Sequence, residues 1–158
     1  MKHLAIVVVV ATLFGLGIAP KALAGQDKVC SNSSLRGSFG YSSTGTLLDS
    51  YVPPPFAGPF AEVGRQTFDG KGNTAGTATL SSNGNINRVT IQGTYTVNAD
   101  CTGSMTLFIP DFGATIHAEF VIDRDGAEIR AIVTEPGVIE SRVYRKQFRE
   151  GREEEQGI

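Results

Sequence analysis

The sequence has no tryptophan, two histidines and two cysteines among its 158 residues. His3 lies in the apolar N-terminal segment, which leaves His117 as the only imidazole in the rest of the chain. Metal centres and His-based catalysis draw on residue types that are scarce here. No catalytic motif stands out. We therefore expect no metal site and no cofactor, and we interpret His117 as a surface residue.

The only long apolar run lies at the N-terminus. Residues 1–3 give it a positive start, residues 4–19 carry no acidic or basic side chain, and Ala22 and Ala24 form a small-x-small cleavage pattern. A bilayer-spanning helix needs about 20 apolar residues, which is longer than this run. We predict that residues 1–24 are a cleavable signal peptide, that no membrane anchor is retained, and that the protein is exported to the periplasm or the medium.

Basic residues are too few for a nucleic-acid partner. Removal of Lys2 and Lys21 with the signal peptide leaves twelve basic residues against sixteen acidic ones. Binding a phosphate backbone needs a positive surface, so no nucleic-acid binding is expected. The remaining chain suits one domain at 35–147, preceded by a short segment at 25–34. The highly charged residues 148–158 predict a disordered tail.

Two cysteines in an exported chain favour one structural disulfide. Cys30 and Cys101 both follow the predicted cleavage site. In an oxidising compartment a disulfide is the more probable use of two thiols. A bond between them would close a long loop in the unfolded chain and so contribute on the order of 4 kcal/mol to stability. It would also attach the N-terminal segment to the domain.

The rest of the chain is rich in Gly, Thr, Val and Ile, with turn signals every 8 to 15 residues. This spacing is typical of an all-β sandwich or barrel. The short links predict an up-and-down antiparallel eight-stranded barrel, which can close on itself and remove its edges. The expected strands are residues 37–47, 61–68, 76–81, 88–97, 104–109, 114–122, 128–134 and 138–146.

The last two turns predict which side chains point inward. A two-residue loop at residues 125–126 and a three-residue loop at residues 135–137 place an apolar face inside the barrel. On this register the inward positions of the last strand are Ile139, Ser141, Val143 and Arg145. The wet outer face then carries His117, Glu119, Asp123, Glu128, Arg130, Glu140 and Arg142.

The pattern resembles the calycin barrels, the superfamily of lipocalins, with allene oxide cyclase-like barrels as a neighbouring possibility. The resemblance rests on a possible helical turn at Ser34-Leu35-Arg36, on Gly37-Ser38-Phe39 at the start of the first strand, and on Arg145 late in the last one. Lipocalins commonly have Gly-x-Trp at that start, with a basic residue packed across the ring. Here Phe39 replaces the tryptophan. The segment from residue 63 to 103 is also similar to parts of uncharacterised exported bacterial proteins.

One long Pro-rich loop, residues 49–60, contrasts with the short links elsewhere. Long loops are often functional, and in lipocalins the corresponding loop folds over the barrel mouth. Its aromatics, Tyr51, Phe56 and Phe60, are candidate ligand-binding residues together with Phe120 and Arg145. The alternative is a stiff loop whose aromatics only pack on the barrel end.

Three functions stay open. The first is non-enzymatic binding of a small apolar ligand under the long loop. The second is a cofactor-free barrel isomerase or cyclase, which needs an inward carboxylate, Tyr or Arg; Glu62, Glu119 or Glu140 inside the barrel would favour it. The third is a structural or interaction module, which a fully packed interior would support.

Overall fold

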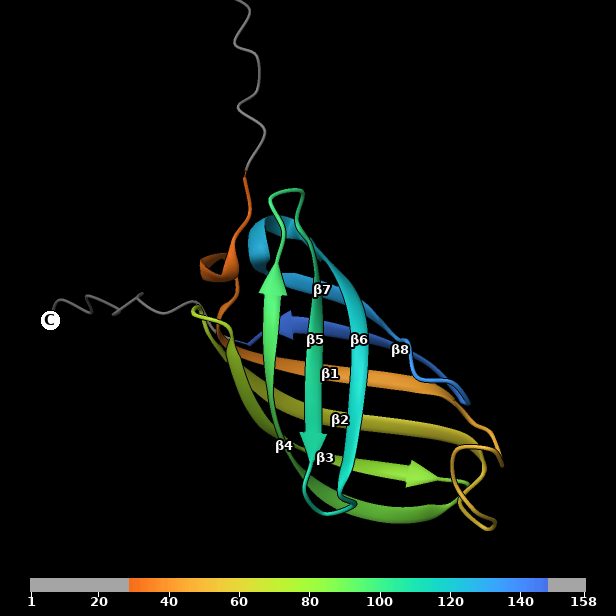
Figure 1. Cartoon of the computed structure of the whole chain (residues 1–158). Helices are drawn as coiled ribbons and strands as arrows, with labels where there is room; N and C mark the ends of the chain where they lie inside the picture. The colour runs from red at the N-terminus through yellow and green to blue at the C-terminus, as the bar shows by residue number, and fades with distance from the viewer. Residues whose placement is uncertain (1–28, 148–158) are drawn as a thin grey trace, which may run out of the picture.

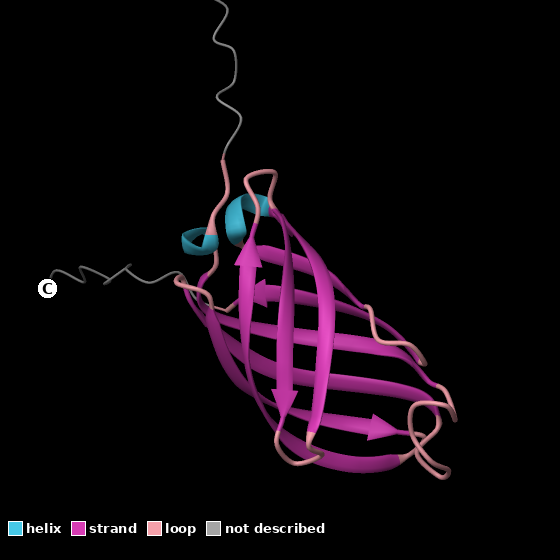
Figure 2. Ribbon diagram, in the orientation of Figure 1, coloured by secondary structure: helices cyan, strands magenta, loops and turns pink. Residues whose placement is uncertain are grey.

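The computed structural model describes residues 29–147 and shows a closed barrel of eight antiparallel strands joined in chain order (Figures 1 and 2). Each strand pairs with its sequence neighbours, and β1 also pairs with β8. The predicted all-β, up-and-down antiparallel barrel of eight strands is therefore confirmed. The strands are β1 (Arg36–Leu47), β2 (Gly58–Asp69), β3 (Asn73–Ser82), β4 (Asn85–Val97), β5 (Thr102–Ile109), β6 (Ala114–Asp123), β7 (Glu128–Val133) and β8 (Val138–Lys146).

All eight predicted strands are present, and the largest differences in their ends are three residues, at Gly58, Asn73 and Asn85. Two short 3-10 helices, η1 (Asn32–Ser34) and η2 (Arg124–Gly126), accompany the strands. Within the described residues, no helix is long and apolar enough to cross a bilayer. The predicted signal peptide and the predicted charged tail lie outside the described residues.

Both short helices, η1 and η2, lie at the same end of the barrel (Figure 2). Aromatic rings fill this end. Phe68 packs edge-on against Phe39, Tyr95 and Tyr144, with ring centroids 5.4, 5.2 and 6.1 Å apart. The hydroxyl of Tyr95 donates to the carbonyl of Leu35 at 2.9 Å and accepts the Gly70 N–H at 3.0 Å. Side chains and hydrogen bonds thus close this end, which we call the closed end.

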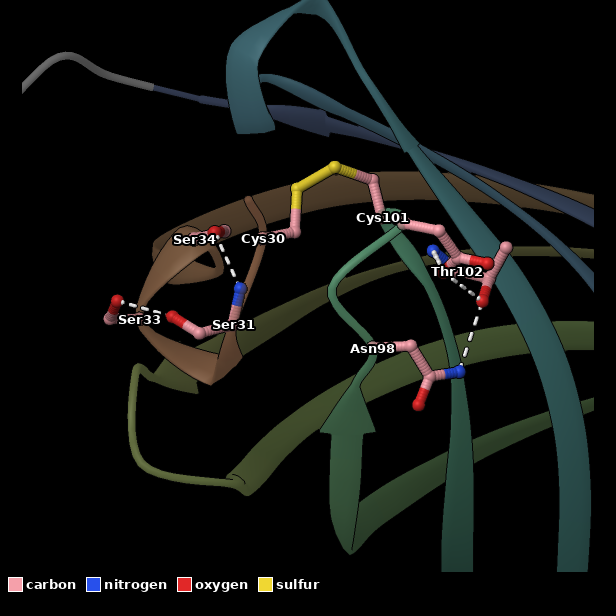
Figure 3. The surroundings of a disulfide bond; sticks show 8 residues. Cys30, Ser31, Ser33, Ser34, Asn98, Cys101 and Thr102 are labelled. Atoms are coloured by element: carbon pink, nitrogen blue, oxygen red, sulfur yellow. Dashed lines mark hydrogen bonds between the residues drawn. A yellow bond between two sulfur atoms is a disulfide. The ribbon is translucent and has the colours of Figure 1, made fainter. Parts of the chain in front are cut away.

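A disulfide joins Cys30 to Cys101, as predicted, with the two Cα atoms 5.0 Å apart (Figure 3). It ties the segment before η1 to the turn between β4 and β5. The same segment is held by the Cys30 N–H, which donates to the Ala99 carbonyl at 3.1 Å, and by Asn32 Oδ1, which accepts the Val97 N–H at 2.8 Å. The N-terminal segment is therefore part of the closed end.

The turn between β6 and β7 has the predicted two-residue geometry. Asp125 and Gly126 have φ values of 57° and 84°, as a type I′ turn requires, and the Ala127 N–H donates to the Arg124 carbonyl at 3.1 Å. Ile122 consequently faces Ile129. The predicted pairing of these two strands is confirmed.

The predicted pairing of β7 with β8 is wrong by one residue. The Val138 N–H donates to the Glu135 carbonyl at 3.1 Å, and Gly137 has a φ of 85°. Pro136 and Gly137 are thus the two central residues of a type II turn, so the loop is one residue shorter than predicted. Because side chains alternate along a strand, this shift exchanges the two faces of β8. Residues Glu140 and Arg142 point inward.

The residues on the other face of β8 were predicted to point inward, but they point to solvent. Ile139 is 63% exposed, Ser141 is exposed, and the side chain of Arg145 is 74% exposed and donates to Glu128 at 3.1 Å. The lipocalin resemblance implied that Arg145 packs across Phe39 inside the barrel. This prediction is wrong, because Arg145 lies on the outer surface. Its strand neighbour in β1 is Gly40.

The turn between β2 and β3 predicts a pH effect on stability. Asp69 accepts backbone N–H donors of Lys71, Gly72 and Asn73 at 2.7 to 3.0 Å, and hydrogen bonds from the Asn73 side chain and backbone lower the pKa of Asp69 to about 2. Since this folded-state pKa lies below the ordinary 3.8, the contribution of the carboxylate is present above about pH 4 and is lost as the pH falls toward 2.

Asp69→Asn should therefore lower the urea midpoint at neutral pH and flatten its decline between pH 4 and 2. Parallel urea titrations of both proteins across this range measure the effect. Asp49→Asn, at an exposed loop carboxylate, is the matched control and should follow the unmodified protein. Identical pH curves for Asp69→Asn and the unmodified protein would contradict the role of the turn.

Candidate ligand cavity

The barrel end opposite η1 and η2 holds a cavity of about 630 Å³. The loops between β1 and β2, β3 and β4, β5 and β6, and β7 and β8 surround it, and we call this the open end (Figure 1). Six strands each contribute a large apolar side chain to the lining: Leu47, Phe60, Leu80, Ile109, Ile116 and Val138. A cavity of this size and lining suits a small, mainly apolar molecule.

The long loop between β1 and β2, residues 48–57, is held across the open end from both sides. The Asn83 side chain, in the turn between β3 and β4, donates to the Pro55 carbonyl at 2.9 Å. On the other side the Leu48 N–H donates to the Gly137 carbonyl at 2.8 Å. The loop is thus fixed as part of the cavity wall, and Tyr51 and Phe56 line the cavity from it.

A buried charged cluster borders the cavity on three neighbouring strands, β2, β1 and β8. It contains Glu62, Glu140 and Arg142 with the hydroxyls of Tyr41 and Ser43. Tyr41 donates to Glu62 Oε1 at 2.6 Å, and Ser43 donates to Glu62 Oε2 at 3.2 Å. The three charged side chains also line the cavity. The cavity therefore combines apolar walls with a concentrated polar patch.

Arg142 is the centre of this cluster. Its side chain is 3% exposed; Nε donates to Glu140 Oε1, and Nη2 lies 3.4 Å from Glu62 Oε2. The guanidinium carbon also lies 5.5 Å from the centre of the Tyr41 ring. Nη1 has no hydrogen-bond partner among the described residues. The buried Tyr144 is a further side-chain hydrogen-bond partner of Arg142, so polar side chains enclose the guanidinium.

Burial governs the ionisation of the cluster. Loss of solvent raises the pKa of Glu140, and Arg142 only partly opposes this effect. Burial by itself lowers the pKa of Arg142, since it disfavours the cation. The electrostatic interactions with Tyr144, Glu62 and Glu140 are together stronger and hold the pKa of Arg142 above its ordinary value. Desolvation, together with Glu62, raises the pKa of Tyr41. Tyr41 consequently stays protonated and can keep donating to Glu62.

Strand register explains why these residues meet. Ser43 is directly opposite Glu62 on one side and Arg142 on the other. Tyr41 is opposite Gly64, and a Cβ at Gly64 would lie 2.6 Å from the Tyr41 ring, so only glycine leaves room for this ring position. The absence of a side chain at Gly64 thus lets the Tyr41 hydroxyl reach Glu62.

The predicted ligand-binding residues fall into two groups. Tyr51, Phe56 and Phe60 all line the cavity; Phe60 is buried and Phe56 is 39% exposed. Phe120 is buried in the packed core and is not among the residues that line this cavity. Arg145 lies on the outer surface for the reason given above. The loop aromatics are thus the part of the predicted site that borders a cavity.

The charged residues of the cluster were not predicted as a site. A usable signal was the parity of β2, because Phe60 and Phe68 both point inward and Glu62 has the same parity. In β8, the large side chains of Val138 and Tyr144 point inward, and alternation along the strand places Glu140 and Arg142 on the same face. Charged side chains were instead expected on the outer face, where such residues usually lie.

His117 lies on the outer face, as predicted, with a half-exposed side chain. Its Nδ1 contacts Glu135, and this hydrogen bond lowers the pKa of Glu135. The expected outer positions of Glu119, Glu128 and Arg130 also hold, since Glu128 binds Arg145 and Arg130 binds Asp123 at the surface. None of the residues in these pairs is among those that line the cavity.

No protein-family model and no curated protein matches this chain. A solved structure of a redesigned β-barrel is similar to it with a TM-score of 0.53 and 15% sequence identity, over 74% of this chain and 95% of that one. The protein is therefore a closed eight-stranded antiparallel β-barrel, and at this identity the likeness concerns the fold alone.

Proposed function

We propose that this barrel binds a small, mainly apolar molecule in the cavity at its open end. The observation that carries the proposal is the contrast between the two ends of the same barrel. Phe39, Phe68, Tyr95 and Tyr144 fill the closed end, whereas the open end retains about 630 Å³. A concave space with mostly apolar walls and a few polar groups is what a small-molecule site requires, whereas a fully packed barrel would leave none.

The experiment is a fluorescence titration with N-phenyl-1-naphthylamine, an uncharged apolar dye whose emission rises in apolar surroundings. The unmodified protein should bind it saturably. Leu80→Trp combined with Ala114→Trp places two large side chains into the cavity from β3 and β6, and should weaken binding by about tenfold or more.

The matched control is Thr77→Trp combined with Glu119→Trp, which adds the same two side chains on the outer faces of β3 and β6. This variant should bind the dye like the unmodified protein. Absence of saturable binding to the unmodified protein, or equal loss in both variants, would contradict the proposal.

We also propose that the protein is an exported, calycin-like barrel. The disulfide at the closed end supports an oxidising compartment, and the N-terminal residue pattern in the sequence supports a signal peptide. The helical turn η1 before β1, the up-and-down order and the long first loop across the open end support the calycin resemblance. Secretion of a tagged full chain, with cleavage after Ala24 checked by mass spectrometry, tests export.

A second candidate function is a cofactor-free isomerase or cyclase, in the manner of the allene oxide cyclase-like barrels. Glu62 and Glu140 lie inside the barrel, and such carboxylates can move protons or steer a reactive substrate in an apolar cavity. Glu119 lies outside and has no part in it. The raised pKa of Glu140, caused by burial, is also what a general acid needs.

This candidate is tested with a panel of unsaturated C18 epoxides, analysed by chromatography for products of unchanged mass. An isomerase should convert at least one of them, and Glu140→Gln should abolish conversion while dye binding persists. If every compound that displaces the dye is recovered unchanged, the cavity binds without catalysis.

A further inference from the structure

We infer that the open-end cavity binds the protonated amino group of an apolar amine, which donates hydrogen bonds to the open polar side chains of Ser82 and Asn87. The negative charge of the buried cluster holds this cation in the cavity. The inference rests on the proposed binding function and adds the chemical class of the ligand, an apolar primary amine. Two independent observations support it: unpartnered polar side chains on the cavity wall, and the net charge of the lining.

Ser82, the last residue of β3, has an unpartnered hydroxyl on the cavity wall. Its side chain lines the cavity, and the residue is 3% exposed. Within the described part of the chain this hydroxyl makes no hydrogen bond. Its oxygen keeps some accessible surface, because the only fully enclosed and unpartnered side-chain atoms there belong to Gln66 and Arg142. A buried polar group normally has a partner, and a ligand in the cavity can supply it.

Asn87 of β4 adds a second open group to the same wall. Its half-buried side chain lines the cavity and makes no hydrogen bond with another described residue. Asn87 is directly opposite Leu80, which precedes Ser82 by two residues on the inward face of β3. Ser82 and Asn87 are therefore diagonal neighbours, and they offer a hydroxyl oxygen and an amide oxygen to one ligand group.

The charge of the lining selects a cation among the groups that could bind there. The carboxylates of Glu62 and Glu140 and the guanidinium of Arg142 line the cavity, and no other charged side chain among the described residues does so. One negative charge is thus left without a partner. An ammonium is attracted to it and a carboxylate is repelled, since little solvent screens charges there. A hydroxyl would leave the charge unbalanced.

The open polar side chains and the unbalanced charge lie close together around Phe60. This residue is opposite Ser82 of β3 on one side and Gly45 of β1 on the other. Glu140 follows beyond Gly45, because these two residues are also opposite each other. Gly45 has no side chain, so Ser82 and Glu140 flank the Phe60 ring along the wall. The face of an aromatic ring attracts cations, so an ammonium beside Phe60 is favoured by all three neighbours.

The test compares three probes with the same carbon chain: dodecylammonium, 1-dodecanol and dodecanoate, each competing with N-phenyl-1-naphthylamine at pH 7. Dodecylammonium should bind more tightly than dodecanol, and at least about tenfold more tightly than dodecanoate, because one charge contact inside a protein is worth at least that factor. Binding of dodecanol or dodecanoate that equals or exceeds that of dodecylammonium overturns the inference.

Glu140→Gln tests the role of charge. Removing one negative charge from the cluster should lower the ratio of dodecylammonium to dodecanol affinity by about tenfold. Glu119→Gln removes the same charge from the outer face of β6 and should leave this ratio unchanged. An equal response to both substitutions contradicts the inference. If Glu140→Gln fails to fold, Glu62→Gln makes the same comparison.

Ser82→Ala tests the contact with the wall. Loss of one hydrogen bond to a cation should weaken dodecylammonium binding by about tenfold and leave dye binding unchanged. Ser104→Ala makes the same change on the outer face of β5 and should have no effect on either. Unchanged dodecylammonium affinity in Ser82→Ala contradicts the proposed position of the ammonium.

The failure of the inference differs from the failure of the proposed function. If the dye itself does not bind, the cavity is not a binding site. If the dye binds but dodecylammonium does not displace it, or displaces it no better than the other probes, the cavity binds apolar molecules without selecting an amine.

Discussion

Replacing Arg142 with methionine should lower the free energy of unfolding at pH 7 by about 3–5 kcal/mol, the usual cost of leaving buried charges without their partner. Methionine keeps much of the length of the side chain, so the loss comes mainly from the charge. Glu62 and Glu140, both buried, would remain without a cation. Urea denaturation followed by far-UV circular dichroism measures the effect.

The dependence on pH identifies the cause. Without Arg142, the pKa of Glu140 should rise further above its ordinary 4.5, because burial already raises it and Arg142 is the group that opposes this. A raised pKa gives stability that is present below pH 4.5 and lost as the pH rises, so the deficit of Arg142→Met should be smaller at pH 4 than at pH 7.

Two further variants bracket this prediction. The triple variant Arg142→Met, Glu62→Gln, Glu140→Gln removes every charge of the cluster and should recover most of the lost stability. Arg130→Met removes an exposed arginine paired with Asp123 and should leave the urea midpoint nearly unchanged. Equal losses for Arg142→Met and Arg130→Met would contradict the buried cluster as described.

Removing the disulfide should have an effect of similar size. Cys30→Ser combined with Cys101→Ser should lower the free energy of unfolding by about 4 kcal/mol, because the bond constrains a long loop in the unfolded chain. The two cysteines are 71 residues apart in sequence. The contacts of Cys30 and Asn32 with β4 and its turn remain, so the folded barrel should keep its circular dichroism spectrum.

The control for this variant is the unmodified protein in a thiol reductant, which should unfold at the urea midpoint of the double variant. The reductant should have no effect on the variant itself. A loss below about 1 kcal/mol would mean that the unfolded chain is already restricted near Cys30, so that the bond adds little.

Much of the fold follows from local turn chemistry. The type I′ turn at Asp125-Gly126 was predictable because few residue pairs adopt two positive φ values, and it correctly aligned β6 with β7. The disulfide was predictable because no other cysteine competes for either partner. These features depend on two or three residues each.

The charged cluster depends instead on one residue of register. The segment Glu135-Pro136-Gly137 can form a three-residue loop, or Pro136 and Gly137 alone can form a two-residue type II turn. The sequence does not decide between these two loops. The choice decides whether Glu140 and Arg142 face solvent or the interior. The predicted outer face looked more plausible, because burying a charge costs energy; Glu62, on another strand, makes the inward face possible by pairing with Arg142.

The loop aromatics were predictable for a different reason. A long Pro-rich loop stands out among short links, and Tyr51, Phe56 and Phe60 are its only aromatic residues. Phe120 could not be separated from the core, since an inward aromatic in the middle of a strand looks the same whether it fills a barrel or lines a cavity.

The most direct test of the open-end cavity is a nuclear magnetic resonance titration of the ¹⁵N-labelled protein with 1-dodecanol. Saturable shifts in the amide signals of Leu47, Leu80, Ile116 and Val138, with little change at Leu35, Phe39 and Phe68 in the closed end, are the predicted result. Shifts confined to the outer surface or to the closed end, or none at saturating dodecanol, would contradict a ligand cavity at the open end of this barrel.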